Sequence, residues 1–535
     1  MQVRVTGKTA GVSEAVFTNR QGRYELVTRL EGDLAVRARL PYYRDATSSV
    51  EVAGRVRVQE DFTLQPMTDP VEISNSLPAA YHFGRLPFET GEDKEFNRWQ
   101  FQRDCLSCHS LGDPFTRIPR SAEAWVATIE RMHRMVGNFD AALRDRRAVI
   151  LAAGFTGEPL SVRPEFPVDP ALEKAKIYEF PLARAYVPHD AIAHPNGLLY
   201  TVDQGLDHIV ITDPVTGESR YVPQTDGRAM EYREGFTTAD QEVLGEFNPG
   251  SRHGPHSLDL AADGKYYVTN TASRSIGVFN PETEQWEPSF VIAEETGAVY
   301  PHTIRADSKG DLWFTLAGSE HVGRLNPASG RFDIVDLPHA VSGGVSAGTQ
   351  PYGVDINPLD DTMWYGRLFA DRIGTVDPQT LEVTEYESPV RGPRRMRFDE
   401  EGILWVTGFS AGRIARIDVR NGFASKVYDM PEFAPGYRPT PYALGVHPDT
   451  QDIWVNEVMT DRIYRFIPAE ERWVAYPVPL AGTYSRDMTF TRNGRVCLSN
   501  NPIPPPVLEG GVLEVLCIDP AYDPTVEAAV ALGQR

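Results

Sequence analysis

Short runs in which apolar and polar residues alternate occupy the first 66 residues of the chain. Two such runs flank a turn signal at residues 19–22, and residues 34–40 alternate with a strict period of two. A period of two is typical of a strand with one buried face. Residues 1–66 therefore predict short β-strands, and the Pro-rich, aperiodic residues 67–90 predict a linker.

The spacing of apolar residues changes to the helical period between residues 91 and 172. We expect a first helix over residues 92–104 and a second after Ser121, a good N-cap. A third is expected near residues 140–152, with Gly154 ending it. The apolar side chains of the second helix recur at positions that share one face. This region predicts a small helical domain.

From about residue 175 one pattern repeats seven times. Each copy has Pro, or Ser in the last copy, followed by His, Tyr or Arg, a hydrophobic run and then an aromatic-rich run. Four short strands per copy, repeated seven times, predict a seven-bladed β-propeller over residues 173–535. A sandwich would not repeat, and a solenoid would not need this order of strands and turns. The copies begin at Pro188, Pro255, Pro301, Pro351, Pro393, Pro441 and Ser485.

Two of these patterns resemble known families. The repeated Pro-His/Tyr-x-hydrophobic, Leu-Trp-hydrophobic-Thr and Arg-Ile-Gly motifs resemble the virginiamycin B lyase (streptogramin lyase) family of propellers over residues 180–520. The run from Phe17 to Tyr24, with Asp61-Phe-Thr-Leu64, resembles the carboxypeptidase regulatory-like domain, a small β-sandwich. That resemblance implies a spacer or attachment module. The family's first strand is weak or missing here, so we expect a shortened N-terminus.

Residues 105–109 spell Cys-Leu-Ser-Cys-His, the attachment signature of a c-type haem. The thiols of Cys105 and Cys108 would add to the two vinyl groups of one porphyrin, and His109 would bind the iron. A thioredoxin-like redox pair would need no His and would be expected near a βαβ pattern, which the sequence lacks. The motif therefore predicts one covalent haem c.

The sixth iron ligand is expected from the second helix. The pattern Trp125-x-x-x-Ile129-x-Arg131-Met132 resembles small class I cytochromes, in which a Met after such a helix binds the iron. The resemblance implies Met132, with Met135 and then His133 as alternatives. The predicted fold class is thus multidomain and mainly β. It combines a β-sandwich at residues 1–66, a linker at 67–90, a cytochrome c domain at 91–172 and the propeller at 173–535.

The charge and the cysteines restrict location and partners. A net charge of −21 argues against nucleic acid and anionic membranes as partners, and no apolar run approaches the length of a membrane span. Cys497 and Cys517 fall in neighbouring strand-like runs, so a disulfide is expected, with two free buried thiols as the alternative. Haem and disulfide together predict a periplasmic or extracellular protein. Because no signal peptide is visible at Met1, we expect that the export signal was removed or lies upstream of this start.

In a propeller, the residue after each Pro would recur at one level around the central axis. A second ring is expected fourteen or fifteen residues later, at the start of the next strand. Such convergent polar groups are a default site hypothesis. The first ring comprises His189, His256, His302, Tyr352, Arg394, Tyr442 and Arg486, and the second comprises Asp203, Asn270, Leu316, Arg367, Gly408, Glu457 and Asn500.

Three functions remain open from these residues. In the first, His189, His256 and His302 hold copper or another divalent metal or act as bases, while Arg394, Arg486 and Arg367 bind an anionic or phenolic small molecule. The substrate's electrons would leave through the haem to an external acceptor, a cytochrome or a membrane electron-transport chain. Further catalytic candidates are Tyr352, Tyr442, Asp203 and Glu457.

The second function is a lyase. The resembling family implies an acid–base His preceded by Glu, a second Glu fourteen residues on and Mg²⁺ nearby. Here Val187, Gly254 or Tyr300 precedes Pro-His, and only His189, with Asp203, keeps the second spacing. In the third function the ring is structural and the chain is a non-enzymatic electron-transfer or binding module. We favour an oxidoreductase, because a β-elimination moves no net electrons and has no use for a cytochrome. A quinone cofactor stays open.

Overall fold

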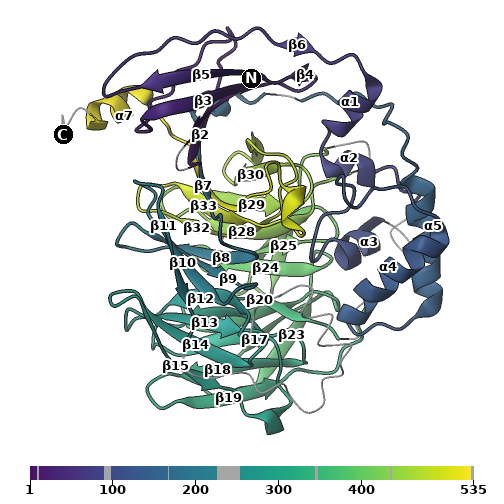
Figure 1. Ribbon diagram of the computed structural model, residues 1–535. Helices are drawn as coiled ribbons and strands as arrows, with labels where there is room; N and C mark the ends of the chain where they lie inside the picture. The colour runs from purple at the N-terminus through teal and green to yellow at the C-terminus, as the bar shows by residue number, and fades with distance from the viewer. Residues whose placement is uncertain are drawn as a thin grey trace.

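The computed structural model describes residues 1–8, 11–89, 98–166, 168–225, 253–343, 348–433 and 437–531. The architecture is mainly β, with six separate four-stranded antiparallel sheets arranged as propeller blades (Figure 1). In each blade the strand that comes first in the chain lies innermost and contacts the first strand of the next blade. Apolar side chains between neighbouring blades form separate core clusters that hold the blades together.

The six blades follow the repeats in chain order. The first blade contains β8 (Pro188–Ala193), β9 (Leu199–Asp203), β10 (His208–Thr212) and β11 (Ser219–Pro223). The second contains β12 (Pro255–Leu260), β13 (Tyr266–Asn270), β14 (Ser275–Asn280) and β15 (Gln285–Val291). The third contains β16 (Pro301–Ala306), β17 (Leu312–Leu316), β18 (His321–Asn326) and β19 (Arg331–Asp336). The fourth blade contains β20 (Pro351–Ile356), β21 (Met363–Arg367), β22 (Arg372–Val376) and β23 (Val383–Glu387). The fifth contains β24 (Pro393–Phe398), β25 (Ile403–Gly408), β26 (Arg413–Asp418) and β27 (Ala424–Asp429). The sixth contains β28 (Pro441–Val446), β29 (Ile453–Glu457), β30 (Arg462–Ile467) and β31 (Arg472–Pro477).

The seventh repeat does not form a separate four-stranded blade, which corrects the prediction of seven. Its strands belong to an eight-stranded sheet in the order β32-β33-β34-β7-β2-β1-β3-β5. Because β32 contacts both β28 and β8, this sheet closes the ring of inner strands. The strands of this sheet are β32 (Ser485–Phe490), β33 (Val496–Asn500), β34 (Glu514–Asp519), β7 (Lys176–Pro181), β2 (Ser13–Phe17), β1 (Gln2–Gly7), β3 (Gly32–Arg39) and β5 (Ala46–Val52).

The separate β-sandwich expected for residues 1–66 is not confirmed, because its strands extend the propeller sheet. Strand β2 pairs antiparallel with β7, with Ser13 opposite Glu179. This pairing covers an edge of β7 that would otherwise present unpaired backbone groups. Arg4 on β1 contacts Glu179 at 2.6 Å across the same sheet. Two short strands, β4 (Tyr43–Arg44) and β6 (Gln65–Pro66), pair beside it.

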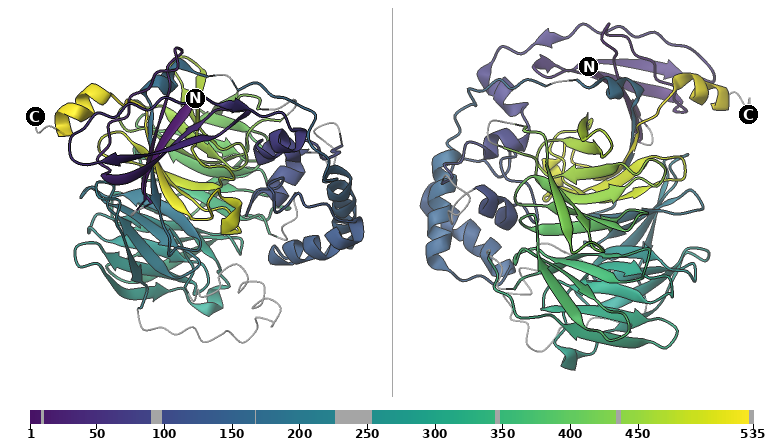
Figure 2. Two further views of the ribbon diagram at one scale, coloured as in Figure 1. Left: turned by 45° about the horizontal axis from the view of Figure 1, so that its top comes forward. Right: turned by 180° about the vertical axis from the view of Figure 1, so that it is seen from behind.

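The helices of residues 70–154 lie along one side of the propeller, as both Figures 1 and 2 show. The helix expected at 92–104 is observed from Arg98, and residues 92–97 lie outside the described residues. Ser121 caps the second helix through Ala124 N, as predicted, and the expected linker contains two short helices. The helices are α1 (Pro70–Asn75), α2 (Ala79–Phe83), α3 (Arg98–Cys105), α4 (Ala122–Met135), α5 (Ala141–Gly154) and, at the far end of the chain, α7 (Pro524–Ala531).

The helices share one apolar core with the propeller, so an independent cytochrome domain is not confirmed. Phe101 and Leu106 are fully buried in the same cluster as Tyr442 of the inner strand β28 and Tyr484, which directly precedes β32. The backbone N–H of Ala80 also donates to the carbonyl of Met459. Among the described helices, none is both long and apolar enough to cross a membrane.

Candidate functional site

The first ring of predicted residues lies on the inner strands and is closed off from solvent. His189, His256 and His302 are 2–3% exposed, and Arg394 and Tyr442 are completely buried. Each ring residue follows the Pro or Ser that begins its inner strand, and in every repeat the pairing with the second strand shifts register there. A β-bulge re-aims side chains. The bulge therefore turns these residues into the axis.

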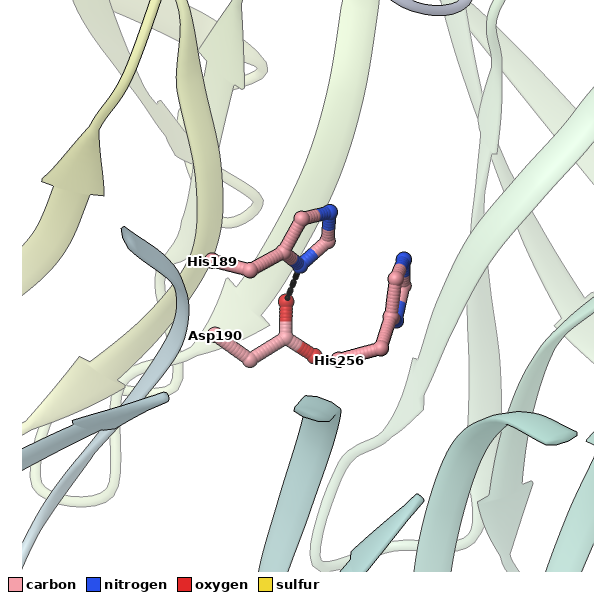
Figure 3. Close-up of side chains that lie close together, drawn as sticks. All are labelled: His189, Asp190 and His256. Carbon is pink, nitrogen blue, oxygen red and sulfur yellow. Dashed lines mark hydrogen bonds and ion pairs between the residues drawn. The ribbon is translucent and has the colours of Figure 1, made fainter. Parts of the chain in front are cut away.

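The three imidazoles lie next to one another on one side of the ring, with neighbouring planes tilted by 36° and 44°. The ring centroids of His189 and His256 are 3.7 Å apart, and those of His256 and His302 are 4.0 Å apart. Figure 3 shows His189 and His256 side by side, with the Asp190 carboxylate bonded to His189 Nδ1 at 2.8 Å. Burial lowers the pKa of His189 to about 4, although Asp190 opposes the shift. Burial also lowers the pKa values of His256 and His302, so all three rings are neutral at pH 7.

Phenols and guanidiniums fill the opposite side of the ring. Arg394 Nη2 donates to Tyr352 Oη at 2.5 Å, and Arg486 Nη1 donates to Tyr442 Oη at 3.2 Å. The two phenol oxygens are 3.2 Å apart, and Tyr442 Oη lies 3.5 Å from His189 Nε2. Burial raises the pKa of Tyr442, but the nearby guanidiniums outweigh it and bring that pKa down to about 8. The ring is thus one connected polar network.

The predicted haem-attachment segment rests directly on this ring. Arg394 Nη2 donates to the carbonyl of Ser107 at 2.9 Å, and Arg486 Nη2 donates to that of Cys108 at 3.2 Å. Tyr484 Oη lies 2.7 Å from the carbonyl of Leu106 and 2.9 Å from that of Ser107. Two motifs that are distant in the sequence therefore meet at the mouth of the axis.

A charged layer lies below the ring. Arg395 donates to Asp190 at 3.0 Å and to Asp487 at 3.1 Å, and all three side chains are buried. Asp487 also contacts Arg397 at 2.5 Å. The guanidinium of Arg395 holds the pKa of Asp190 below its usual range despite burial. Sequence reasoning missed Asp190, Arg395 and Asp487, each of which directly follows a ring residue. A bulge can turn two consecutive residues inward, so the shared Pro-x-x position was the available signal.

The second ring differs from the prediction. Its residues stand at the end of the second strand of each repeat, opposite the Pro or Ser that begins the inner strand, and not at the start of the strand. Asp203 accepts from the backbone N–H groups of Tyr186, Val187 and Gly205. Glu457 accepts from Met459 N and from Thr460. Both carboxylates thus anchor backbone beside the ring, and a catalytic role for either stays a prediction.

The residues predicted to hold haem fit that group. Cys105 and Cys108 are free thiols, and Cys108 is exposed. His109 Nδ1 bonds the carbonyl of Ser110 at 2.7 Å, which makes Nδ1 the protonated nitrogen and leaves the Nε2 lone pair for a metal. A carbonyl partner of this kind is typical of metal-binding His. The structure thus presents two thiols and one oriented imidazole.

The sixth ligand is not resolved among the three candidates on α4. Met132 and Met135 are half-buried, whereas His133 is buried, and its Nε2 lies 3.2 Å from Arg147 Nη1. Arg147 in turn pairs with Asp104, next to Cys105. Burial and Arg147 lower the pKa of His133 to about 4. His133 is therefore the candidate that a hydrogen-bonded chain links to α3.

The remaining cysteines are joined as expected. Cys497 on β33 lies directly opposite Cys517 on β34, and the two form a disulfide. Strand β34 then pairs with β7, so the disulfide lies beside the closure between the two ends of the propeller. It cross-links the sheet that also carries Arg486 and Tyr484 close to the attachment segment.

Comparisons with known proteins support a lyase-like propeller. The sequence model of the Virginiamycin B lyase family matches residues 246–434. A streptogramin B lyase structure is similar with a TM-score of 0.52 and 17% identity, covering 66% of this chain and 99% of that chain. A catalytically inactive virginiamycin B lyase from Staphylococcus aureus with quinupristin matches with a TM-score of 0.50 and 15% identity, covering 64% and 99%. No curated protein sequence matches the chain. At these identities the structural likeness shows the fold alone.

Proposed function

We propose that this chain is a periplasmic haem c oxidoreductase in which a small molecule is oxidised at the axial ring. Electrons would leave through the haem to an external acceptor. The observation that carries the proposal is the contact between ring and attachment motif: Arg394, Arg486 and Tyr484 donate to the carbonyls of three consecutive residues, 106–108. A haem bound there would be adjacent to the ring, as electron transfer requires.

Cys105, Cys108 and His109 would hold the haem, with a ligand from α4 completing the iron. When bound, the haem supplies a one-electron carrier. The chain's own residues would bind the substrate and move its proton. Arg394 Nε and Nη1 are buried and without a hydrogen-bond partner among the described residues, so this side favours an anion or a phenol oxygen.

The proton would go to the imidazole side. His189 is neutral, and Asp190 fixes its tautomer with the proton on Nδ1, so Nε2 has a free lone pair. Tyr442 lies between that nitrogen and Arg486. A proton taken at His189 Nε2 would be stabilised by the Asp190 carboxylate, in the manner of a base with an orienting partner.

A lyase is the second candidate, because the family match favours it. Two features of this chain count against it. No Glu precedes any of the three Pro-His pairs, and residues 106–108 cover the ring where a substrate would enter. A substrate such as quinupristin would need this segment to move away. The oxidoreductase needs only a small substrate beside the segment.

The decisive experiment is expression of the full chain with export and haem attachment. We expect one covalent haem per chain, lost in Cys105→Ala/Cys108→Ala, and haem reduction by a phenol, aldehyde or small anion. Arg394→Gln should abolish reduction of the haem by the substrate, while dithionite still reduces the haem. A chain without covalent haem, or one that opens quinupristin without net oxidation, contradicts the proposal. If the haem exchanges electrons with acceptors but none of the small molecules reduces it, the chain would instead be an electron-transfer module.

A further inference from the structure

The imidazole side of the ring contains His256, a donor that the proposed proton transfer does not use, beside His189 and Asp190, which it does use. His189, Asp190 and His256 each offer a ligand atom, and these atoms all lie within 4.8 Å of one another. Figure 3 shows the carboxylate of Asp190 below His189 and the His256 ring facing both. All three side chains are nearly completely buried. Such a cluster of three ligands on two adjacent inner strands is compact enough to hold one ion.

His256 supplies the observation that points to a ligand. Its Nδ1 is buried and has no hydrogen-bond partner among the described residues. An unpaired buried polar atom costs about 1–3 kcal/mol, so such atoms in a native fold call for a partner. The neighbouring rings are satisfied at the same atom, because His189 Nδ1 bonds Asp190 and His302 Nδ1 bonds Thr303 Oγ1. Among these three imidazoles, His256 is the exception at Nδ1.

The surroundings of the cluster match those of a metal site. Asp190 is held by two hydrogen bonds from Arg395, so its position is fixed before any ion binds. Asp487 offsets part of the charge of Arg395. Nitrogen donors favour a transition metal over Mg²⁺ or Ca²⁺, which prefer oxygen.

We propose that His256, through Nδ1, together with His189 and Asp190 binds one divalent transition-metal ion, separate from the haem. His302, 4.0 Å from His256 between ring centroids, lies beside this site and is a positioning residue for it. The ion would sit opposite Arg394 and Arg486, so the ring would present a cation side and an anion-binding side. The site shares no ligand with the haem, and the hydrogen bonds and ring contacts of its ligands in the described residues go to other parts of the chain.

The test is metal analysis of full chains purified from Zn²⁺- or Cu²⁺-supplemented cultures and dialysed against metal-free buffer. Loading during expression is needed because the site is buried. We expect about one Zn²⁺ or Cu²⁺ per chain. His256→Ala should lower metal retention at least about tenfold, as should Asp190→Asn. Iron is counted separately, so loss of haem and loss of this ion are distinguished.

His447→Ala is the matched control. His447 is also buried, but both its ring nitrogens are bonded, Nε2 to the carbonyl of Gly494 and Nδ1 to backbone N–H groups. The His447→Ala variant should retain the wild-type metal content. His256→Gln, which keeps more of the side-chain volume, should lose the ion like His256→Ala and retain the wild-type circular dichroism spectrum. Equal metal content in wild type and both His256 variants overturns the proposal, as does wild-type protein that carries neither ion.

Discussion

Tyr484→Phe isolates the contact that joins the attachment segment to the propeller. The Tyr484 hydroxyl is completely buried and lies within 2.9 Å of two carbonyls, those of Leu106 and Ser107. The carbonyl of Ser107 keeps its bond from Arg394 after the substitution, so Leu106 loses its partner. An unsatisfied buried carbonyl costs about 1–3 kcal/mol. The free energy of opening of the segment should fall by that amount.

Hydrogen exchange of the peptides covering residues 98–113 measures this local opening. A loss of about 1–3 kcal/mol corresponds to exchange about 5–150 times faster. Global unfolding is a poor readout, because a chain of several packed units is not two-state. Tyr200→Phe, which removes a buried hydroxyl from the first blade, should leave this segment unchanged. Unaltered exchange at 98–113 in Tyr484→Phe would show that the contact does not hold the segment.

Three further changes test other parts of the same structure. Glu509 accepts hydrogen bonds from both arginines of β3, and these bonds outweigh the effect of burial and bring the pKa of Glu509 down to about 2. Glu509→Gln should therefore make the N-terminal strands easier to proteolyse at pH 7, and the wild type should lose the stabilisation from Glu509 as the pH falls from about 4.5 towards 2. Glu284→Gln, which removes a carboxylate from an exposed ion pair, should have little effect. Arg486→Gln should lower the haem reduction potential, because it removes a positive charge beside the attachment segment, and each tenfold change in the equilibrium constant corresponds to about 59 mV. Arg486→Lys keeps the charge and should keep most of the potential. Equal potentials in the wild type and both variants would exclude an electrostatic role for Arg486. Gly353→Ala should destabilise the ring by about 1–3 kcal/mol, because the new Cβ would lie 2.3 Å from the Arg394 carbonyl oxygen. Hydrogen exchange of the peptides covering β20 and β24 measures this loss, and unchanged exchange would mean that the two inner strands can separate.

The axial ring could be predicted from the sequence because it depends on a short-range signal. A Pro begins six of the seven inner strands, and the following residue occupies the same place in each repeat. The attachment motif was equally local. What the sequence could not provide was the contact between them, since nothing near Cys108 indicates that Arg486 lies against its carbonyl. Long-range docking depends on side-chain packing that a single sequence does not display.

The shared sheet was unpredictable for a related reason. Strands of residues 1–66 alternate as a sandwich strand would, and alternation specifies a buried face but not the partner. The partner was decided by β7, whose free edge accepts β2. Asp190 was missed because an ideal strand sends consecutive residues to opposite faces, whereas the bulge at each inner strand turns two of them inward.

The opposite characters of the two halves of the ring constrain what the site can bind. Arg394, Arg395 and Arg486 bring three positive charges into a buried space where Asp190 and Asp487 supply only two negative ones. An uncompensated charge is costly there, which favours ionised Tyr442 or a bound anion on the arginine side. An anion would also favour a metal ion at His256, and thermodynamic linkage requires the ion to favour the anion equally. For the proposed oxidoreductase, the substrate class that best satisfies this charge balance would be a small anion, or a phenol that binds as the phenolate after His189 has taken its proton.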